Sequence, residues 1–255
     1  MRQALFVMAK DPRAGQVKTR LCPPLTAETA ARLYECFLLD VLDLVTGIPG
    51  VDPVVAFSPP RAREEFARLT GGRFLLIPQQ GSDLGARLEN SFRVLFEQGY
   101  DRVAAVSTDS PDLPAEYLQE AFSRLERARV VLGPCPDGGY YLIGLSDLIP
   151  ELFRDMPWST DRVVPETEAR VRGMGLTLSY LPEWHDVDTA TDLNRLVKTL
   201  TGLGGSDTRA PRTTRFCREE FRGEQATVGP DRTPRCGGDC GRWGEGENPG
   251  SQGPA

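Results

Sequence analysis

Short apolar runs alternate with amphipathic stretches over the first 200 residues of the chain. Residues 5–9 are apolar without polar alternation, which predicts a strand buried on both faces of a sheet. Residues 26–46 carry leucine, phenylalanine and valine at helical spacing, which predicts a long amphipathic helix. Further strands are predicted at residues 53–57, 74–77, 102–106, 130–132, 140–145 and 176–181, and helices at residues 61–69, 84–98, 115–127, 160–172 and 189–200.

This order of elements is typical of a single α/β domain with a doubly wound, mostly parallel sheet. Such sheets bind their ligands beyond the carboxyl ends of the strands. Candidate functional residues should therefore follow the strands directly. Three segments that do so are unusual in composition, and they are residues 10–24, 107–114 and 134–139.

Composition changes near residue 200. Residues 201–255 hold 12 of the 26 glycines and 5 of the 21 prolines, and only 11 of these 55 residues are hydrophobic. Such a segment buries too little apolar surface to offset its chain entropy. We therefore predict a folded domain at residues 1–200 and a disordered tail at residues 201–255.

Charge and cysteine content exclude several classes of protein. The tail is neutral, so the formal net charge of −6 lies in the first 200 residues and argues against a nucleic-acid binder. A mean hydropathy of −0.33, without a long apolar run, predicts no membrane span. The six cysteines are sparse and no secretory signal is recognised, which predicts a cytoplasmic protein. Cys236 and Cys240 offer too few ligands for a zinc site and are predicted to be disordered.

The loop after the first strand concentrates positive charge. It contains Lys10, Arg13, Lys18 and Arg20, in a chain that has 27 arginines and only three lysines. Compact ammonium groups beside a strand end are typical of a polyphosphate site, and a solvated basic loop is the alternative. The loop is not a Walker A motif, because Val17 stands where that motif has its second glycine.

The segment after the fourth strand carries two carboxylates, Asp109 and Asp112. A carboxylate just past a buried strand, followed by a proline-fixed turn, is a common way to present a metal ligand or a base. Asp109 is the better placed of the two. Asp112 is predicted to cap the helix that follows Pro114, with a role as a base as the alternative.

A third segment contains Asp137, followed by two adjacent glycines. Two glycines allow the backbone to approach a ligand closely, and a tight hairpin turn explains them equally well. Asp137 is therefore a candidate catalytic residue, with a turn as the structural alternative.

Two carboxylates, Asp186 and Asp188, alternate before the last predicted helix. They share one side of an extended chain, so with Asp109 they are candidate oxygen ligands for a hard cation. Asp188 or Thr189 is predicted to cap the last helix. The chain's single histidine, His185, is a weaker candidate for a base.

Six stretches together resemble a family of small bacterial proteins, the radical-SAM/selenodomain-associated transferase 1 family. The resemblance implies a glycosyltransferase-A fold of the nucleotide-diphospho-sugar transferase type, close to the molybdenum-cofactor and phospholactate guanylyltransferases. The stretches lie in the family's order between about residues 3 and 197, and they are residues 10–12 with 15–21, 81–88, 108–113, 133–144, 156–160 and 185–189.

The resemblance implies a nucleotide site formed by two segments. Its residues would be Lys10, Arg13, Lys18 and Arg20, facing the diphosphate, and Gly81, Gly85 and Arg87, in the nucleotide pocket.

The resemblance also implies that Asp109 and Asp188 bind a divalent cation, Mg²⁺ or Mn²⁺. Many glycosyltransferases of this fold carry an Asp-x-Asp motif, from which this chain departs because Ser107 stands two residues before Asp109. Nucleotidyl transfer therefore stays open beside sugar transfer.

Three functions are compatible with these residues. The main prediction is a glycosyltransferase that moves a sugar from a nucleoside-diphosphate sugar to a small acceptor. Asp109, its cation and Lys18 would stabilise the leaving group, and Asp137 or Asp112 would accept a proton. Nucleotidyl transfer from a nucleoside triphosphate to a phosphorylated small molecule is one alternative, and a nucleotide-binding protein without turnover is the other. The sequence carries no signal for the acceptor or the oligomeric state.

Overall fold

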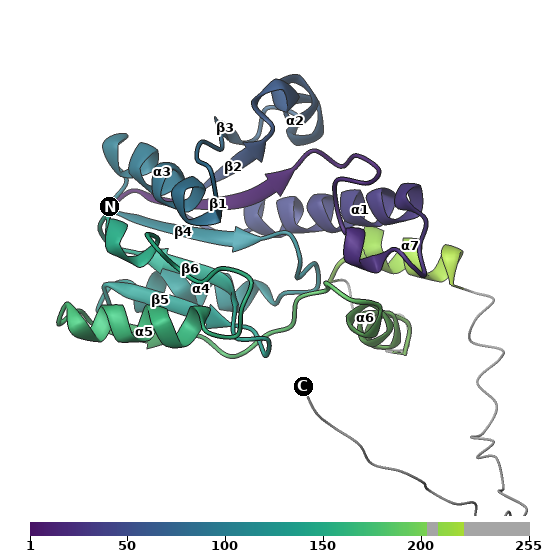
Figure 1. The fold of residues 1–255 in the computed structure, drawn as a ribbon. Helices are drawn as coiled ribbons and strands as arrows, with labels where there is room; N and C mark the ends of the chain where they lie inside the picture. Colours follow the sequence, from purple (N-terminus) through teal and green to yellow (C-terminus); the bar gives the residue numbers. More distant parts are fainter. Residues whose placement is uncertain (203–208, 222–255) are drawn as a thin grey trace, which may run out of the picture. The chain divides into compact units, whose positions relative to one another are not determined.

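A computed structural model describes residues 1–202 and 209–221 of the chain. In these residues seven strands form one sheet with the order β3-β2-β1-β4-β6-β5-β7 (Figure 1). β6 runs antiparallel to β4 and β5, and the other paired strands are parallel. The strands are β1 (Gln3–Lys10), β2 (Asp52–Ser58), β3 (Leu75–Pro78), β4 (Arg102–Ser107), β5 (Val130–Pro134), β6 (Tyr140–Leu145) and β7 (Leu178–Tyr180).

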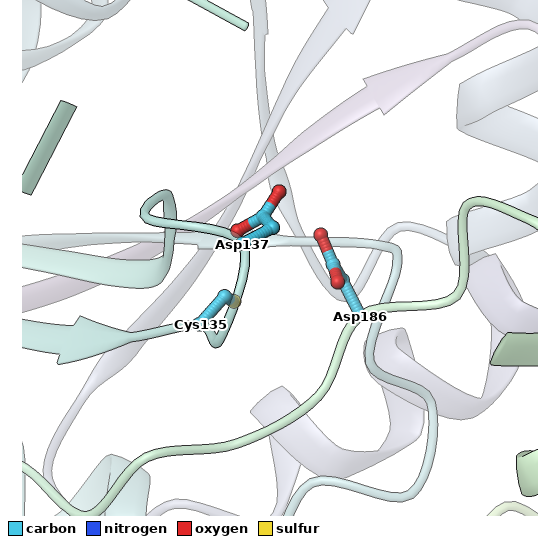
Figure 2. A group of neighbouring side chains, drawn as sticks. All are labelled: Cys135, Asp137 and Asp186. Carbon is cyan, nitrogen blue, oxygen red and sulfur yellow. The ribbon is translucent and has the colours of Figure 1, made fainter. Parts of the chain in front are cut away.

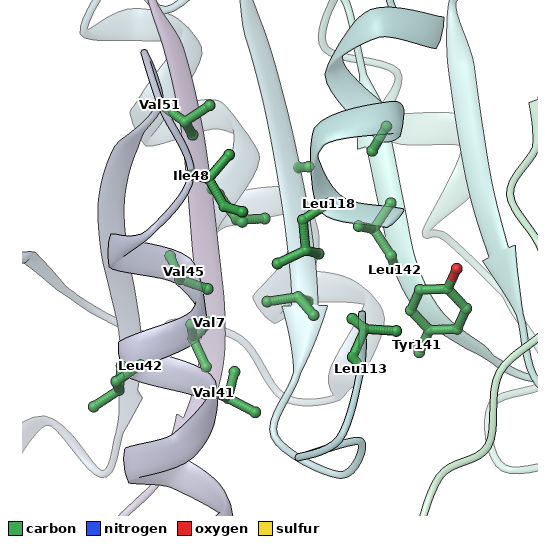
Figure 3. Close-up of a cluster of buried hydrophobic side chains, with 14 of the residues drawn as sticks. Val7, Val41, Leu42, Val45, Ile48, Val51, Leu113, Leu118, Tyr141 and Leu142 are labelled. Carbon is green, nitrogen blue, oxygen red and sulfur yellow. The ribbon is translucent and has the colours of Figure 1, made fainter. Parts of the chain in front are cut away.

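Helices cover both faces of the sheet, which confirms the predicted doubly wound fold. Side chains of β1 alternate between two separate apolar clusters, with Val7 in one and Phe6 in the other. One cluster includes residues from α1 (Ala27–Thr46), α2 (Arg63–Thr70) and α4 (Ala115–Arg124), as Figure 3 shows in part. The other includes residues from α3 (Leu84–Glu97) and α5 (Val163–Gly173).

The predicted element boundaries differ from the observed ones mainly at helix ends. The helix predicted from residue 160 begins at Val163, because residues 157–162 form turns in which Thr160 Oγ1 donates to the Pro157 carbonyl. A short 3₁₀ turn, Pro60–Ala62, precedes α2. The last predicted helix is α6 (Ala190–Gly202). Among the described residues, no helix combines the length and apolar character that crossing a bilayer requires.

The predicted boundary at residue 200 is wrong for part of the tail. A further helix, α7 (Pro211–Glu220), lies inside the segment predicted to be disordered, and it packs against α1 (Figure 1). Its buried residues include Phe216 and Cys217. The remainder of the predicted tail, with Cys236 and Cys240, lies outside the described residues.

Asp40 of α1 holds α7 through the first turn of that helix. The carboxylate is buried, and it accepts hydrogen bonds from the backbone N–H groups of Arg212 and Thr213 at 3.1 and 2.8 Å. These N–H groups have no partner within their own helix, so an acid supplied by another helix caps it. Arg32 of α1 pairs with Glu220 at the other end of α7 at 2.9 Å, so the two helices run antiparallel.

We expect Asp40→Ala to lower the free energy of unfolding by about 2 kcal/mol, because two buried N–H groups lose a charged acceptor. For a domain of this size the melting temperature should fall by about 4–8 °C in a calorimetric scan. The control is Asp43→Ala, whose carboxylate is half-exposed and pairs with Arg212 at 2.7 Å. It should cost no more than about 1 kcal/mol. Equal losses in the two variants would contradict the capping role.

Candidate active site

A cavity of about 630 Å³ opens at the carboxyl edge of the parallel strands. It is lined by the loop after β1, the segment between β3 and α3, the end of β4, the β5–β6 hairpin and the segment before α6. These are the positions at which α/β sheets bind ligands. Seven of the candidate residues line it, and they are Lys10, Lys18, Arg20, Arg87, Asp109, Asp186 and Asp188.

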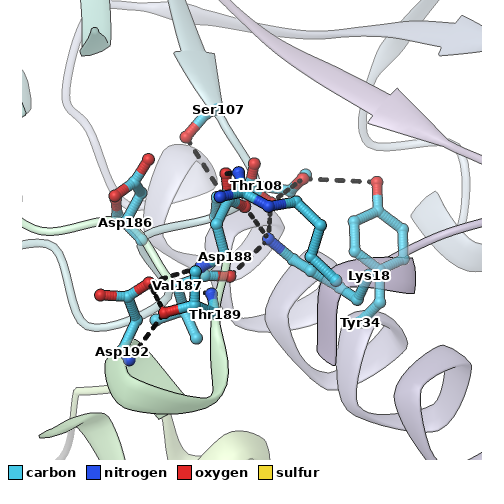
Figure 4. Close-up of polar contacts among 12 residues, drawn as sticks. Lys18, Tyr34, Ser107, Thr108, Asp186, Val187, Asp188, Thr189 and Asp192 are labelled. Atoms are coloured by element: carbon cyan, nitrogen blue, oxygen red, sulfur yellow. Dashed lines mark hydrogen bonds and ion pairs between the residues drawn. The ribbon is translucent and has the colours of Figure 1, made fainter. Parts of the chain in front are cut away.

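Lys18 is the centre of the polar contacts in this cavity. Its Nζ lies 2.5 Å from Asp109 Oδ1 and 3.1 Å from Asp188 Oδ1, and it donates to the Val187 carbonyl at 2.7 Å (Figure 4). Only 5% of the side chain is exposed. Burial lowers the pKa of Lys18, but the two carboxylates raise it by more, so the pKa lies above its usual value and the ammonium stays charged.

The loop after β1 holds Lys18 in an unusual backbone conformation. Its φ of 48° lies in the left-handed region, which a residue with a Cβ adopts at a cost in energy. Val17, one residue earlier, is buried against Ala31 and Tyr34 of α1 and so anchors the loop. This packing of the loop on α1 maintains the strained conformation that directs Lys18 toward the two carboxylates.

Asp109 is fixed by contacts between the β4 loop and the segment before α6. Its backbone N–H donates to Ser107 Oγ at 3.2 Å, and its carbonyl accepts from Val187 N–H at 2.9 Å. Ser110 Oγ donates to the His185 carbonyl at 2.8 Å. These bonds join two segments that are distant in sequence, so the Asp109 carboxylate faces the residues before α6.

Asp188 lies just before the start of α6, where Thr189 caps the helix. Thr189 N–H donates to Asp192 Oδ2 at 2.8 Å, and Thr189 Oγ1 accepts from Asp192 N–H at 3.4 Å (Figure 4). This reciprocal pair is a capping box, and it confirms Thr189 as one of the two predicted caps. The cap fixes the backbone at Asp188, so its carboxylate is free to pair with Lys18 and Arg20.

Cys135, Asp137 and Asp186 form what we call the acidic group (Figure 2), and Figure 4 shows Asp186 beside the contacts of Lys18. One ligand atom from each residue lies within 4.8 Å of the others. Cys135 and Asp186 line the cavity, and Asp137 lies in the hairpin turn, where its Oδ1 accepts from Gly139 N–H. Burial, with Asp137 and Asp188 nearby, raises the pKa of Asp186 to about 6.

Other predicted residues have structural contacts away from the cavity lining. Arg13 pairs through Nε with the buried carboxylate of Asp11 at 2.5 Å. Gly81 has φ +139°, and a Cβ there would lie 2.6 Å from Ala86 Cβ. A Cβ on Gly85 would clash with the Phe153 carbonyl. The lining residues of this segment include Asp83 and Arg87 rather than the glycines.

The predicted cap at Asp112 is wrong. α4 has no side-chain cap, and Asp112 instead accepts a hydrogen bond from Trp184 Nε1 at 3.3 Å. Neither Asp112 nor the exposed His185 is among the residues that line the cavity. Their side chains therefore lack the position that a base acting in this cavity requires.

Sequence reasoning missed Tyr34 and Gln79, whose contacts are all long-range. Tyr34 OH accepts from Lys10 N–H at 2.9 Å and from Thr108 Oγ1 at 3.3 Å, so it joins the ends of β1 and β4. The Gln79 amide donates to the Ala9 and Ala56 carbonyls, at 3.1 and 2.7 Å. Both side chains line the cavity. Gln79 is a polar residue directly after β3, and this position after a strand was the sequence signal that could have identified it.

The chain is similar to several known proteins. Residues 41–160 match the model of the DUF2064 family, described as an uncharacterized protein conserved in bacteria. A phosphoenolpyruvate guanylyltransferase of Nocardia farcinica is 29% identical over 223 residues, which cover 81% of this chain and 90% of that protein.

Solved structures share the fold. A protein from Desulfovibrio desulfuricans G20, described as a "putative nucleotide-diphospho-sugar transferase", has a TM-score of 0.80 and 33% identity, covering 87% of this chain and 96% of that one. A cytidylyltransferase from Leptospira borgpetersenii has a TM-score of 0.53 and 14% identity, covering 87% and 96%, and its likeness concerns the fold alone.

We expect Asp186→Asn to stabilise the protein above pH 6. The raised pKa of Asp186 means that its ionisation is less favourable in the folded than in the unfolded chain, so it lowers stability as pH rises from about 4 to 6. With screening of this partly exposed group, the gain at pH 7.5 should be about 1 kcal/mol, or about 2–4 °C in melting temperature. It should vanish at pH 4. Metal-free scanning calorimetry measures both.

The control for this prediction is Asp161→Asn, because Asp161 is exposed and does not line the cavity. Its stability should stay within about 0.5 kcal/mol of the wild type at both pH values. A gain for Asp186→Asn that is the same at pH 4 and pH 7.5 would contradict the electrostatic origin.

Proposed function

Because this chain belongs to the DUF2064 family, we propose that it is a divalent-cation-dependent transferase that uses a nucleotide donor, and that the group transferred is nucleotidyl. The observation that carries the proposal is the buried Lys18 ammonium between the carboxylates of Asp109 and Asp188. Likeness to a guanylyltransferase favours nucleotidyl transfer, and so does the absence of an Asp-x-Asp motif at Ser107.

Asp109 and Asp188 suit a divalent cation. Their Oδ1 atoms already lie within 3.1 Å of one positive charge, the Lys18 ammonium, and come from two rigid segments. Carboxylate oxygens are the ligands that Mg²⁺ and Mn²⁺ prefer. Asp109 and Asp188 would hold the cation, whose positive charge would offset the negative charge that develops on the leaving group.

The other cations of the cavity suit the phosphates and the nucleoside. Lys10 is the last residue of β1, Arg20 belongs to the loop that follows, and Arg87 belongs to α3. Lys18, which contacts Asp109 and Asp188, would donate hydrogen bonds to the donor phosphate oxygens. Electrostatic stabilisation of this kind is usually the largest contribution to catalysis, at about 2.7–4 kcal/mol for one donor.

Asp137 is the proposed proton acceptor. It is not itself among the lining residues, but its carboxylate lies within 4.8 Å of ligand atoms of Cys135 and Asp186, which line the cavity, and it is exposed, so it can return the proton to solvent. Glycosyl transfer is the second candidate function, favoured by the 33% identity to the Desulfovibrio desulfuricans protein. Membership of the radical-SAM-associated transferases, a location in the cytoplasm and nucleotide binding without turnover stay predictions.

The proposal is tested by calorimetric binding and product release. With Mn²⁺, we expect GTP or CTP to bind and pyrophosphate to be released, whereas release of nucleoside diphosphate from UDP-glucose or GDP-mannose would favour the second candidate. Asp109→Ala should weaken metal-dependent nucleotide binding at least about 100-fold. Asp112→Asn, outside the cavity lining, is the control and should bind normally. No metal-dependent binding by the wild type would falsify the proposal.

We expect Lys18→Met to bind Mn²⁺ about tenfold more tightly without nucleotide, because the ammonium no longer competes for the two carboxylates. The same variant should bind the metal–nucleotide complex at least about tenfold more weakly, since a phosphate contact is lost. Titration calorimetry measures both affinities. Lys198→Met, on the exposed side of α6, is the matched control. Unchanged Mn²⁺ affinity in Lys18→Met would show that the ammonium and the metal use different oxygens.

A further inference from the structure

The charges that line the cavity are segregated. The loop after β1 and the segment from β3 into α3 supply every cation among the described lining residues, with Asp83 as their one acid. The β5–β6 hairpin contributes Cys135 and two tyrosine rings to the lining, and the segment before α6 contributes Asp186 and Asp188, without a cation; Asp137 lies next to Cys135 and Asp186. The cations are Lys10, Lys18, Arg20 and Arg87.

The segregation assigns the two halves of the cavity to two substrates. The cationic half suits the phosphates of the donor, and Asp109 and Asp188 between the halves suit its metal ion. The half that Asp186 and Tyr140 line, with Asp137 next to Asp186, remains for the acceptor. Resting on the proposed function, we infer that the acceptor is an uncharged or cationic compound with a hydroxyl or amino nucleophile, and that phosphorylated and carboxylated compounds are rejected.

Repulsion is the physical reason for this rejection. A phosphate or carboxylate beside Asp137 and Asp186 would lie against two acids, and like charges repel more strongly at the partly buried Asp186 than in water. The residues that line this half offer it no compensating cation. Arg162, in the turn before α5, is exposed and is not among the lining residues.

An uncharged nucleophile is also consistent with the chemistry of the acidic group. In the transfer, the acceptor oxygen or nitrogen forms a bond to the α-phosphorus of the donor, and the bond from that phosphorus to the pyrophosphate oxygen breaks. The proton of the hydroxyl or amine passes to the Asp137 carboxylate and then to solvent. A phosphate nucleophile carries no such proton at neutral pH and would gain nothing from a carboxylate at this position.

This acceptor class differs from the one that a relative's name indicates. Phosphoenolpyruvate, in the name of the Nocardia farcinica guanylyltransferase, carries a phosphate and a carboxylate. An anionic acceptor would fit here only if a second divalent cation bound Cys135, Asp137 and Asp186 and reversed the local charge.

The test compares acceptors that differ by one charged group. Protein with Mg²⁺ and GTP or CTP is supplied with glucosamine or glucosamine 6-phosphate, and with glycerol or glycerol 3-phosphate. Pyrophosphate release above hydrolysis is measured. In each pair that reacts, we expect kcat/KM to be at least about tenfold higher for the unphosphorylated compound than for the phosphorylated one. Faster reaction of the phosphorylated members would overturn the inference.

A binding measurement keeps the inference testable without turnover. Phosphoenolpyruvate is titrated into protein loaded with Mg²⁺ and the α,β-methylene analogue of GTP. We expect the wild type to bind it at least about tenfold more weakly than the double variant Asp137→Asn/Asp186→Asn. Asp161→Asn, which removes an exposed charge that does not belong to the acidic group, should behave as the wild type.

The opposite binding result would overturn the inference. In that result the wild type binds phosphoenolpyruvate tightly together with a second equivalent of metal ion, and the double variant loses this binding. Failure of the proposed function is a separate observation, because it is read from metal-dependent nucleotide binding before any acceptor is added.

Discussion

The burial of one ammonium group between two carboxylates is the interaction on which the site depends. Lys18 comes from the loop after β1, and Asp188 lies 170 residues further along the chain. A charge removed from water needs opposite charges in fixed positions, and the loss of either partner leaves the other uncompensated. The bond between Val187 N–H and the Asp109 carbonyl supplies that fixed position. Three distant segments are thereby held together at one point.

The sheet explains why those segments meet. β1 and β4 are parallel neighbours, so their carboxyl ends bring the Lys18 loop and Asp109 to the same edge. Because β6 is antiparallel to β5, the turn between them also lies at this edge and adds Cys135 and Asp137. The reversed strand β6 therefore adds Cys135 and Asp137 to the edge that also carries Lys18 and Asp109.

The sequence predicted the fold class and the residues whose signal is local. Asp109 comes two residues after β4, and Lys18 lies in the loop after β1. Both strands are buried, so the position of these two residues at the carboxyl edge could be inferred from strand order. The pairing of Arg13 with Asp11, and that of Asp112 with Trp184, depend on where side chains pack, which composition does not encode. α7 was missed for the same reason. Its own residues are polar, and an acid of α1 stabilises its first turn.

The docking of α7 on α1 determines where the chain can be truncated or fused to another protein without loss of packing. The change in composition at residue 200 suggests a natural end to the domain, but the contacts of the folded chain extend to Glu220. A protein shortened at residue 200 would lose both the N–H groups from which Asp40 accepts and the helix that packs on α1. Shortened forms and fusion partners are therefore best joined beyond residue 221, where the helix that covers α1 is complete.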